Sequence, residues 1–212
     1  MATGRVPNKD ILEAANTGVE LNQCGYINTD EYLQTNVPGI WALGDIVGRY
    51  LLKHSANLEA AYASNNILDP ENQAPVDYHA MPHPVFASPQ VASVSLTQQE
   101  AAGRGAAYIT PIYNYSDTAY GASIEDHDRF VKVLADPETE EMLGCHVIGI
   151  DATTLIQEVA NATRSCAGVD AILQSIYVHP ALPELCSALL VDCPCGRRRS
   201  VIHEELSLWN WE

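Results

Sequence analysis

The sequence predicts an α+β fold: an antiparallel sheet with helices on one face, preceded by a shorter region of mixed structure. Two observations support this class. One long helical pattern ends at prolines near residue 70, and several short runs rich in β-branched and aromatic residues follow them. Strands that follow one another through short turns pair antiparallel, and helices then cover one face. A hydrophobic content of 47% is enough for a packed core.

The region before residue 70 is predicted to hold short elements and one long helix. The helix is Leu51 to Leu68, LLKHSANLEAAYASNNIL, which has helical spacing and good helix formers. Pro70 and Pro75 end it and suggest a linker. The short elements are a turn at Gly4 to Asn8, one or two helical turns at Asp10 to Ala15, and strands at Tyr26 to Asn28 and Ile40 to Leu43.

The region after the linker is predicted to hold the sheet. Its strands are Val85 to Ala87, Val91 to Leu96, Ala106 to Tyr113, Phe130 to Ala135 and Met142 to Ile150. Thr97 and Glu100 form a capping box at the start of a short helix. Asp136 to Thr139, DPET, is the turn of a hairpin. Two further helices are predicted, Ala152 to Cys166 with Asp151 as its cap, and Val169 to Ile176.

The charge balance argues against nucleic acid as a partner and suggests adaptation to a salt-rich cytoplasm. The chain has 27 acidic and 11 basic residues, a formal net charge of −16, so a polyanion would be repelled. Self-repulsion destabilises such a fold in dilute salt and is screened at high ionic strength, so we expect a halophilic-like adaptation. The sequence has neither a long apolar run nor the apolar core of a secretory signal, so we expect no membrane contact and a cytoplasmic location.

The stretch from Thr35 to Asp45, TNVPGIWALGD, is the most informative in the chain. It is read as a turn, a short buried strand and a Gly-Asp pair at the carboxyl end of that strand, where an open α/β sheet binds ligands. Gly44 lets the backbone pass close to a bound group. The carboxylate of Asp45 repels phosphate but accepts hydrogen bonds from sugar hydroxyls, which indicates a nucleotide-type cofactor held by its polyol. The alternative is a plain turn after a buried strand.

The start of the long helix is a second candidate for cofactor binding. Backbone N–H groups at a helix start carry partial positive charge and suit an anionic partner. Leu52, Lys53 and His54 occupy this position. An ordinary polar first turn accounts for His54 equally well, so the prediction rests more on the backbone than on that side chain.

His179 and Glu184, in the sequence HPALPE, are the catalytic candidates. Two prolines stiffen the backbone, so an imidazole and a carboxylate five residues apart can be presented together. The carboxylate can fix the tautomer of the imidazole and stabilise its protonated form, which suits acid–base work. Taken alone, a His-Pro with a nearby glutamate also fits an ordinary surface loop.

We expect structural roles for three cysteines, four histidines and three tyrosines. Burial as small apolar residues is expected for the isolated cysteines Cys24, Cys145 and Cys166. Surface or strand positions, without the spacing of metal ligands, are expected for His79, His83, His127 and His146. Strand packing or an interface is expected for Tyr113, Tyr115 and Tyr120.

The tail from Cys186 onward has a different composition from the rest of the chain. Cys193 and Cys195, with Cys186 and His203, can be drawn as a metal site. Paired zinc-binding cysteines are usually separated by about two to four residues, a spacing absent here, so no metal is predicted. Arg197 to Arg199 is read as a solvated basic patch.

Several segments, in one consistent order, resemble a single family. TNVPGIWALGD resembles the second flavin-binding signature of the pyridine nucleotide-disulfide oxidoreductases, the class I flavoprotein disulfide reductases. GRVPN also resembles this family, and PVFASPQVASVSLTQQEA, FVKVLADPETEEMLGCHVIG and YVHPALPE resemble pieces of its C-terminal dimerisation domain. GRYLLKHSANLEA looks most like mycothione reductase members, with dihydrolipoamide dehydrogenase a near second. The likeness covers roughly residues 2 to 185.

The resemblance implies roles for the candidate residues. In this family the aspartate at the position of Asp45 binds the ribityl chain of FAD, and the helix start at 52–54 approaches the pyrimidine edge of the flavin. The histidine at position 179, oriented by the glutamate at position 184, protonates a thiolate leaving group in the active site of the partner subunit of a homodimer. Electrons pass from NAD(P)H to FAD, then to a redox disulfide, then to a low-molecular-weight thiol disulfide.

The resemblance also divides the chain. Residues 1–76 are expected to be the C-terminal part of an FAD- and NAD(P)-binding region, the remnant of an α/β FAD-binding domain. Residues 77–190 are the expected dimerisation domain, and 191–212 a divergent tail.

Parts of a working enzyme of this family are missing from the sequence. It has no Gly-x-Gly-x-x-Gly turn, because Gly103-Arg104-Gly105 lacks the third glycine, and no cysteine pair with four intervening residues. We therefore expect the C-terminal portion of a longer enzyme, inactive by itself. The alternative is a non-catalytic truncated dimerisation module without bound flavin.

The acidic composition predicts that salt stabilises the folded chain. Raising the ionic strength from about 0.01 M to about 1 M shortens the Debye length from about 30 Å to about 3 Å and screens repulsion among the carboxylates. At constant pH the melting temperature, followed by circular dichroism, should rise by several degrees over this range. A flat profile would remove the idea of adaptation to salt.

Overall fold

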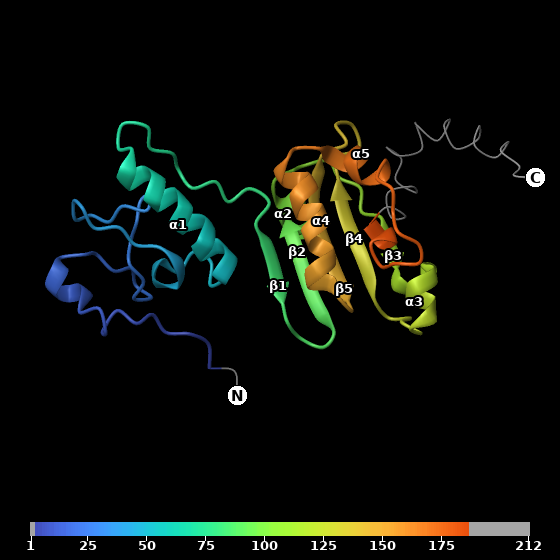
Figure 1. The fold of residues 1–212 in the computed structure, drawn as a ribbon, viewed down its shortest axis with the longest axis horizontal. Coiled ribbons are helices and arrows are strands. Elements are labelled where there is room, and N and C mark those ends of the chain that lie inside the picture. Colours follow the sequence, from blue (N-terminus) through green and yellow to red (C-terminus); the bar gives the residue numbers. More distant parts are fainter. Residues whose placement is uncertain (1–2, 187–212) are drawn as a thin grey trace, which may run out of the picture. The chain divides into compact units, whose positions relative to one another are not determined.

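The structure, a computed structural model, describes residues 3–186, which form two units that divide between Tyr78 and His79 (Figure 1). The second unit is built on a five-stranded antiparallel sheet with helices. This combination confirms the predicted α+β class. The three-part division at residues 76 and 190 stays a prediction.

The first unit consists of turns and short helices around one long helix. Its helices are the 3₁₀ helices η1, Ala14–Thr17, and η2, Gly44–Val47, and the α-helix α1, Lys53–Leu68. A small apolar core is centred on Val19, Ile27 and Ala42. Ile46 and Val47 of η2 pack against it, so this core holds the segment that ends the TNVPGIWALGD motif.

Helix α1 confirms the predicted helix, although it begins at Lys53 rather than Leu51. The side chains buried on its inner face are mostly polar: Ser55, Glu59, Ala63 and Asn66. The side-chain amide of Asn66 donates to the carbonyl of Ala74 at 2.9 Å, and its oxygen accepts the N–H of Ala74 at 2.8 Å. Hydrogen bonds to surrounding chain segments therefore help to hold this helix in place.

The short elements predicted in this unit differ from those observed. Residues 3–8 run without a turn, and the helical turns expected at 10–15 become turns that lead into η1. Each of the two predicted strands is reduced to one isolated bridge, Ile27 with Leu21 and Trp41 with Gln34. Both predictions of strands are wrong because the backbone leaves the ladder beside each bridge. The N–H of Ile27 donates to the carbonyl of Ile46 instead, and Leu33, next to Gln34, has a positive φ.

The sheet of the second unit has the strand order β1-β2-β5-β4-β3. The strands are β1, Pro82–Val85; β2, Gln90–Ser95; β3, Ile112–Asn114; β4, Phe130–Ala135; and β5, Met142–Gly149. The predictions for β2, β4 and β5 are confirmed to within one residue at each end. The predicted hairpin turn between β4 and β5 is also present, since Asp136 Oδ1 accepts the N–H groups of Glu138 and Thr139 at 2.8 Å.

The predicted bounds of two strands, β1 and β3, are wrong, and proline residues account for both differences. β1 covers 82–85 rather than 85–87, because an edge strand tolerates Pro82 and Pro84 without their N–H groups. β3 covers 112–114 rather than 106–113. Before it the chain makes a single bridge, from Ile109 to Ala135, and Pro111 cannot donate to a ladder.

Helix α4, Ala152–Arg164, covers one face of the sheet and contacts β1, β2 and β5 (Figure 1). Its apolar side chains and those of α5, Gly168–Leu173, join the strands in one core. Both predicted helices are confirmed, with earlier ends. The predicted side-chain cap is wrong: Asp151 has positive φ and its carboxylate makes no capping hydrogen bond. Among residues 3–186, every helix is too short or too polar to cross a membrane.

The short helices of this unit are α2, Gln98–Gly103, η3, Tyr115–Asp117, and α3, Ala119–Ser123. The predicted capping box is confirmed at α2, where Thr97 and Glu100 bond reciprocally. Tyr115 is fully buried, and its hydroxyl donates to the carbonyl of Ile150 at 2.9 Å. Burial raises the pKa of Tyr115. Of the other two tyrosines, Tyr113 lies in β3 and Tyr120 lies in α3, where it is partly exposed.

Candidate functional site

The loop after α5 brings His179 and Glu184 together. His179 Nδ1 lies 2.7 Å from Glu184 Oε1, and Oε2 accepts the backbone N–H of Ala181 at 2.9 Å. The N–H of Ala181 and the imidazole of His179 hold the pKa of the Glu184 carboxyl below its ordinary value. Glu184 is therefore an ionised acceptor with both oxygens engaged.

This pairing determines which nitrogen of the imidazole can exchange a proton. Because the carboxylate accepts from Nδ1–H, Nε2 is the nitrogen left to meet a reacting group. The side chain of His179 is 69% exposed, whereas that of Glu184 is 23% exposed. The imidazole can therefore reach a ligand while its partner stays against the protein, an arrangement suited to proton transfer.

Two leucines fix the C-terminal part of this loop. Leu182 and Leu185 are buried in the core of the second unit. Ile176 and Val178, which precede His179, are exposed. The loop thus has an anchored part that carries Glu184 and an apolar surface beside the imidazole.

Gly44 and Asp45 lie at the start of η2, after an extended Leu43. Gly44 has a φ of 75°, and a Cβ there would lie 3.3 Å from Cβ of Ala56 on α1. Its N–H donates to Glu59 Oε2 at 2.5 Å. Glycine is therefore required by the backbone conformation and by the close approach of α1.

Asp45 lines a pocket of about 540 Å³ in the first unit. The carboxylate pairs with the guanidinium of Arg5 at 2.9 Å, and both side chains are more than half exposed. Arg5 also donates to the carbonyl of Leu51 at 2.7 Å, so it connects η2 to the start of α1. The other lining residues are mainly apolar: Val6, Pro7, Asn8, Ile11, Leu12, Tyr26 and Ile46. The lining of the pocket thus combines one charged pair with mainly apolar side chains.

Glu59 is a functional candidate that sequence reasoning missed. It is fully buried on α1, and its two carboxylate oxygens accept from the N–H of Gly44 at 2.5 Å and from the hydroxyl of Tyr78 at 2.8 Å. Burial and this carboxylate raise the pKa of Tyr78 to about 12. The sequence offered one signal that Glu59 is buried: it lies one helical turn from both Ser55 and Ala63, on the same face of the predicted helix.

Leu52, Lys53 and His54 form the start of α1, as expected. Leu52 is the N-terminal cap residue, and its carbonyl accepts from the hydroxyl of Ser55 at 2.7 Å. The ammonium group of Lys53 bonds the side chain of Asn57 on the same helix. Their roles in cofactor binding stay predictions.

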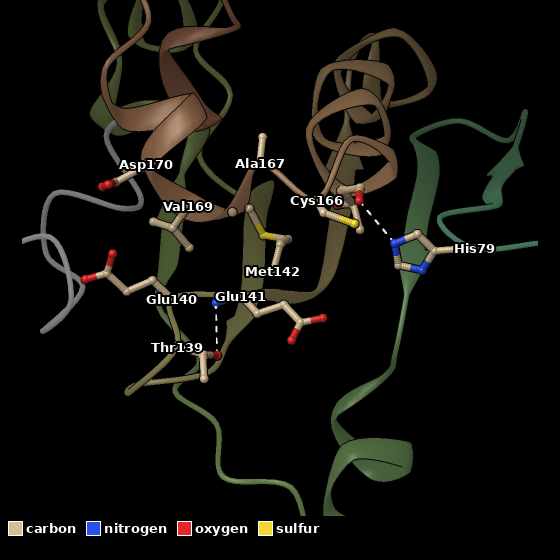
Figure 2. Close-up of a pocket in the computed structure, with 11 residues that line it drawn as sticks. His79, Thr139, Glu140, Glu141, Met142, Cys166, Ala167, Val169 and Asp170 are labelled. Carbon is tan, nitrogen blue, oxygen red and sulfur yellow. Dashed lines mark hydrogen bonds between the residues drawn. The ribbon is translucent and has the colours of Figure 1, made fainter.

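A second pocket, of about 530 Å³, lies where α4 ends and α5 begins (Figure 2). Its ionisable lining groups include the carboxylates of Glu140, Glu141 and Asp170 and the thiol of Cys166. His79 Nε2 lies 3.1 Å from the carbonyl oxygen of Thr163, so a hydrogen bond joins the segment before β1 to α4. The carboxylates make this pocket unsuitable for an anionic group.

The predictions for single cysteines and histidines are partly right. Cys145 is buried in β5, as predicted. The predicted burial is wrong for Cys24, which lies exposed at a turn, and for Cys166, which is exposed after α4 and has a positive φ. Burial raises the pKa of Cys145. The histidines lie at exposed or strand positions, as expected: His79, His83, His127 and His146.

Among the residues that the structure describes, no group of three His, Cys, Asp or Glu side chains is arranged to hold a metal ion. Cys186 is buried. The residues with which it could be drawn as a metal site, Cys193, Cys195 and His203, lie outside the described residues, as does the cluster Arg197 to Arg199.

Two family models match the chain. The model described as pyridine nucleotide-disulphide oxidoreductase, dimerisation domain, matches residues 81–189. The model described as pyridine nucleotide-disulphide oxidoreductase matches residues 1–63. The first match includes His179 and Glu184, and the second includes Asp45 and Glu59.

Two relatives match most of the chain. Mycothione reductase from Mycobacterium tuberculosis is 37% identical over 190 residues, which are 87% of this chain and 41% of that protein. Dihydrolipoyl dehydrogenase 3 from Haloarcula marismortui is 32% identical over 203 residues, which are 96% of this chain and 41% of that protein. The chain therefore spans 41% of the length of these relatives.

Solved structures have the same fold. LpdA from Mycobacterium tuberculosis superposes with a TM-score of 0.80 at 26% identity, over 92% of this chain and 41% of that one. The HOCl-induced flavoprotein disulfide reductase RclA from Escherichia coli gives a TM-score of 0.82 at 23% identity, over 90% of this chain and 44% of that one. The second likeness concerns the fold alone.

Removing the carboxylate of Glu59 should loosen the Asp45 segment. Glu59→Ala leaves the N–H of Gly44 and the hydroxyl of Tyr78 without their acceptor, and should lower the free energy of unfolding by about 3 kcal/mol. Glu59→Gln keeps one acceptor oxygen and should cost less. The exposed Glu71→Ala should stay within about 0.5 kcal/mol of the parent chain. Urea unfolding of the full chain measures all three, and equal effects of Glu59→Ala and Glu71→Ala would contradict the assignment.

Proposed function

The chain belongs to the pyridine nucleotide-disulphide oxidoreductase family, and we propose that it forms the C-terminal portion of an FAD-dependent NAD(P)H:disulfide oxidoreductase. The family uses FAD and NAD(P)H. The observation that carries the proposal is the pair of His179 and Glu184, joined at 2.7 Å inside the region matched as a dimerisation domain. A low-molecular-weight thiol disulfide is the proposed substrate class, supported by the likeness to a mycothione reductase.

The residues of the first unit fit the proposed cofactor. Asp45 offers a carboxylate on a pocket whose wall is apolar, which suits a molecule with a polyol chain and an aromatic ring. Gly44, Leu52, Lys53 and His54 are the other residues proposed to bind it, with the N–H groups of the α1 start facing negative charge. FAD, when bound, supplies the two-electron chemistry between NAD(P)H and a disulfide. Arg5, which already pairs with Asp45, would exchange that contact for one with the ligand.

His179 is proposed to supply the proton of the reaction. A thiolate leaves when thiol–disulfide exchange breaks a sulfur–sulfur bond, and a protonated Nε2 beside the leaving sulfur lowers the cost of that charge. Glu184 stabilises the imidazolium through Nδ1 and keeps the ring oriented. The proton moves from Nε2 to sulfur, and the neutral imidazole then regains one from solvent.

A homodimer is the proposed assembly. The match to a dimerisation domain supports it, as do exposed apolar side chains of the second unit, among them Phe86, Ile176 and Val178. Val178 is adjacent to His179, so an interface there would carry the imidazole to the partner subunit. The active site would then be composite.

The alternative is a non-catalytic dimerisation module without flavin. One observation favours it: the groups proposed to hold the cofactor are already satisfied within the chain, because Asp45 pairs with Arg5 and the N–H of Gly44 with Glu59. This module would dimerise and remain colourless.

Flavin binding separates the two functions. The purified chain should show a flavin absorbance band or quench the fluorescence of added FAD, and Asp45→Ala should weaken binding by about 10- to 100-fold, the effect of losing a hydrogen bond to a charged group. The matched control is Glu71→Ala, which removes an exposed carboxylate from the same unit and should leave binding unchanged. A colourless dimer that binds no FAD would support the alternative.

A further inference from the structure

Tyr177, two residues before His179, connects the loop to helices α4 and α5. Its hydroxyl lies 2.5 Å from Oε1 of Glu158 on α4 and 3.0 Å from the carbonyl oxygen of Ile172 on α5. A tyrosine hydroxyl donates one hydrogen at a time, and an ionised carboxylate is the stronger acceptor. Glu158 therefore takes this hydrogen bond, and the loop is tied to the helix that covers the sheet.

The surroundings of this contact strengthen it. Tyr177 is half-buried and packs against the core that includes Cys186. Burial and the nearby Glu158 carboxylate raise the pKa of Tyr177, and raise that of Cys186 to about 12, so both groups keep their protons. A carboxylate next to an apolar core is costly unless it accepts a hydrogen bond. Tyr177 provides that donor.

On the N-terminal side of His179, the loop is held to the rest of the unit by Tyr177. Among the described residues between Leu173 and Ala181, Tyr177 alone is not exposed. Beyond His179, the buried Leu182 and Leu185 fix the part that carries Glu184. The distance between His179 and Glu184 therefore depends on two anchors, one polar and one apolar.

We propose that Tyr177 and Glu158 are positioning residues that hold His179 within hydrogen-bond distance of Glu184, an inference that rests on the acid–base role proposed for that pair. With the anchor in place, Nδ1 stays on the carboxylate and Nε2 stays directed at a reacting sulfur. When the anchor is removed, residues 174–180, which are exposed apart from position 177, gain freedom and the imidazole leaves Glu184 for part of the time. Tyr177 acts through His179 rather than through contact with a substrate.

The tautomer of His179 reports this positioning directly. In the full chain, long-range ¹⁵N NMR near pH 9, where an ordinary imidazole is neutral, should show His179 mainly as the Nδ1–H form, with His179→Gln used to assign its signals. Tyr177→Phe keeps the ring and removes the hydroxyl, and should lower the ratio of Nδ1–H to Nε2–H about three- to tenfold, the range expected for one lost hydrogen bond. Glu158→Gln keeps an acceptor oxygen and should preserve most of the ratio.

Controls separate positioning from general loss of structure. Tyr113→Phe removes a hydroxyl that donates to the carbonyl of Asp117 elsewhere in the same unit, and should leave the ratio unchanged. If Tyr177→Phe does not fold, Glu158→Ala removes the same bond from the helix side. It should shift the ratio in the same direction but by less, because the hydroxyl of Tyr177 can still donate to the carbonyl of Ile172.

The outcomes distinguish this inference from the proposed function. A parent chain in which His179 is not mainly Nδ1–H would overturn the pairing with Glu184, and with it the proposed acid–base role. A parent chain with that tautomer, together with an unchanged ratio in Tyr177→Phe or an equal change in Tyr113→Phe, would overturn the anchor while leaving the proposed function intact.

Discussion

Carboxylates that accept hydrogen bonds from donors other than lysine and arginine hold the functional segments of this chain. With 27 acidic residues and 11 basic ones, most carboxylates cannot find a cation. Glu59 instead accepts from a backbone N–H and a tyrosine hydroxyl, and Glu158 accepts from another tyrosine hydroxyl. Glu184 accepts from a backbone N–H and an imidazole. A buried or half-buried carboxylate without such donors would be strongly unfavourable, so each one fixes the segment that supplies them.

These contacts connect the fold to the proposed chemistry. In the first unit, Glu59 on α1 fixes the backbone at Gly44 and so determines where Asp45 presents its carboxylate. In the second unit, Glu184 orients the imidazole of His179, and Glu158 is proposed to hold the chain just before it. The groups proposed to meet ligands, Asp45 and His179, are largely exposed, while their supports are more buried. This division leaves the groups proposed to meet ligands accessible while their positions stay fixed.

The sequence predicted what depends on local pattern and missed what depends on distant partners. β4 was predicted to the residue because FVKVLA is an unbroken run with strong strand propensity. β1 was misplaced because Pro82 and Pro84 argue against a strand, although an edge strand accepts them. The pairing of His179 with Glu184 could be proposed because both lie in one stiff loop. Glu59 was missed because its donors, Gly44 and Tyr78, are 15 and 19 residues away, so its position on the helix face could not identify them.

The central claim is that this chain contributes a proton donor, His179, to a flavin-dependent disulfide reductase. The most direct measurement is NAD(P)H-dependent disulfide reduction by a chimera in which this chain replaces the matching 41% of the Mycobacterium tuberculosis mycothione reductase. The account predicts turnover with His179, and a fall in kcat of about 10²- to 10⁴-fold in His179→Gln at unchanged FAD content. An active chimera whose His179→Gln variant turns over at the same rate would contradict it.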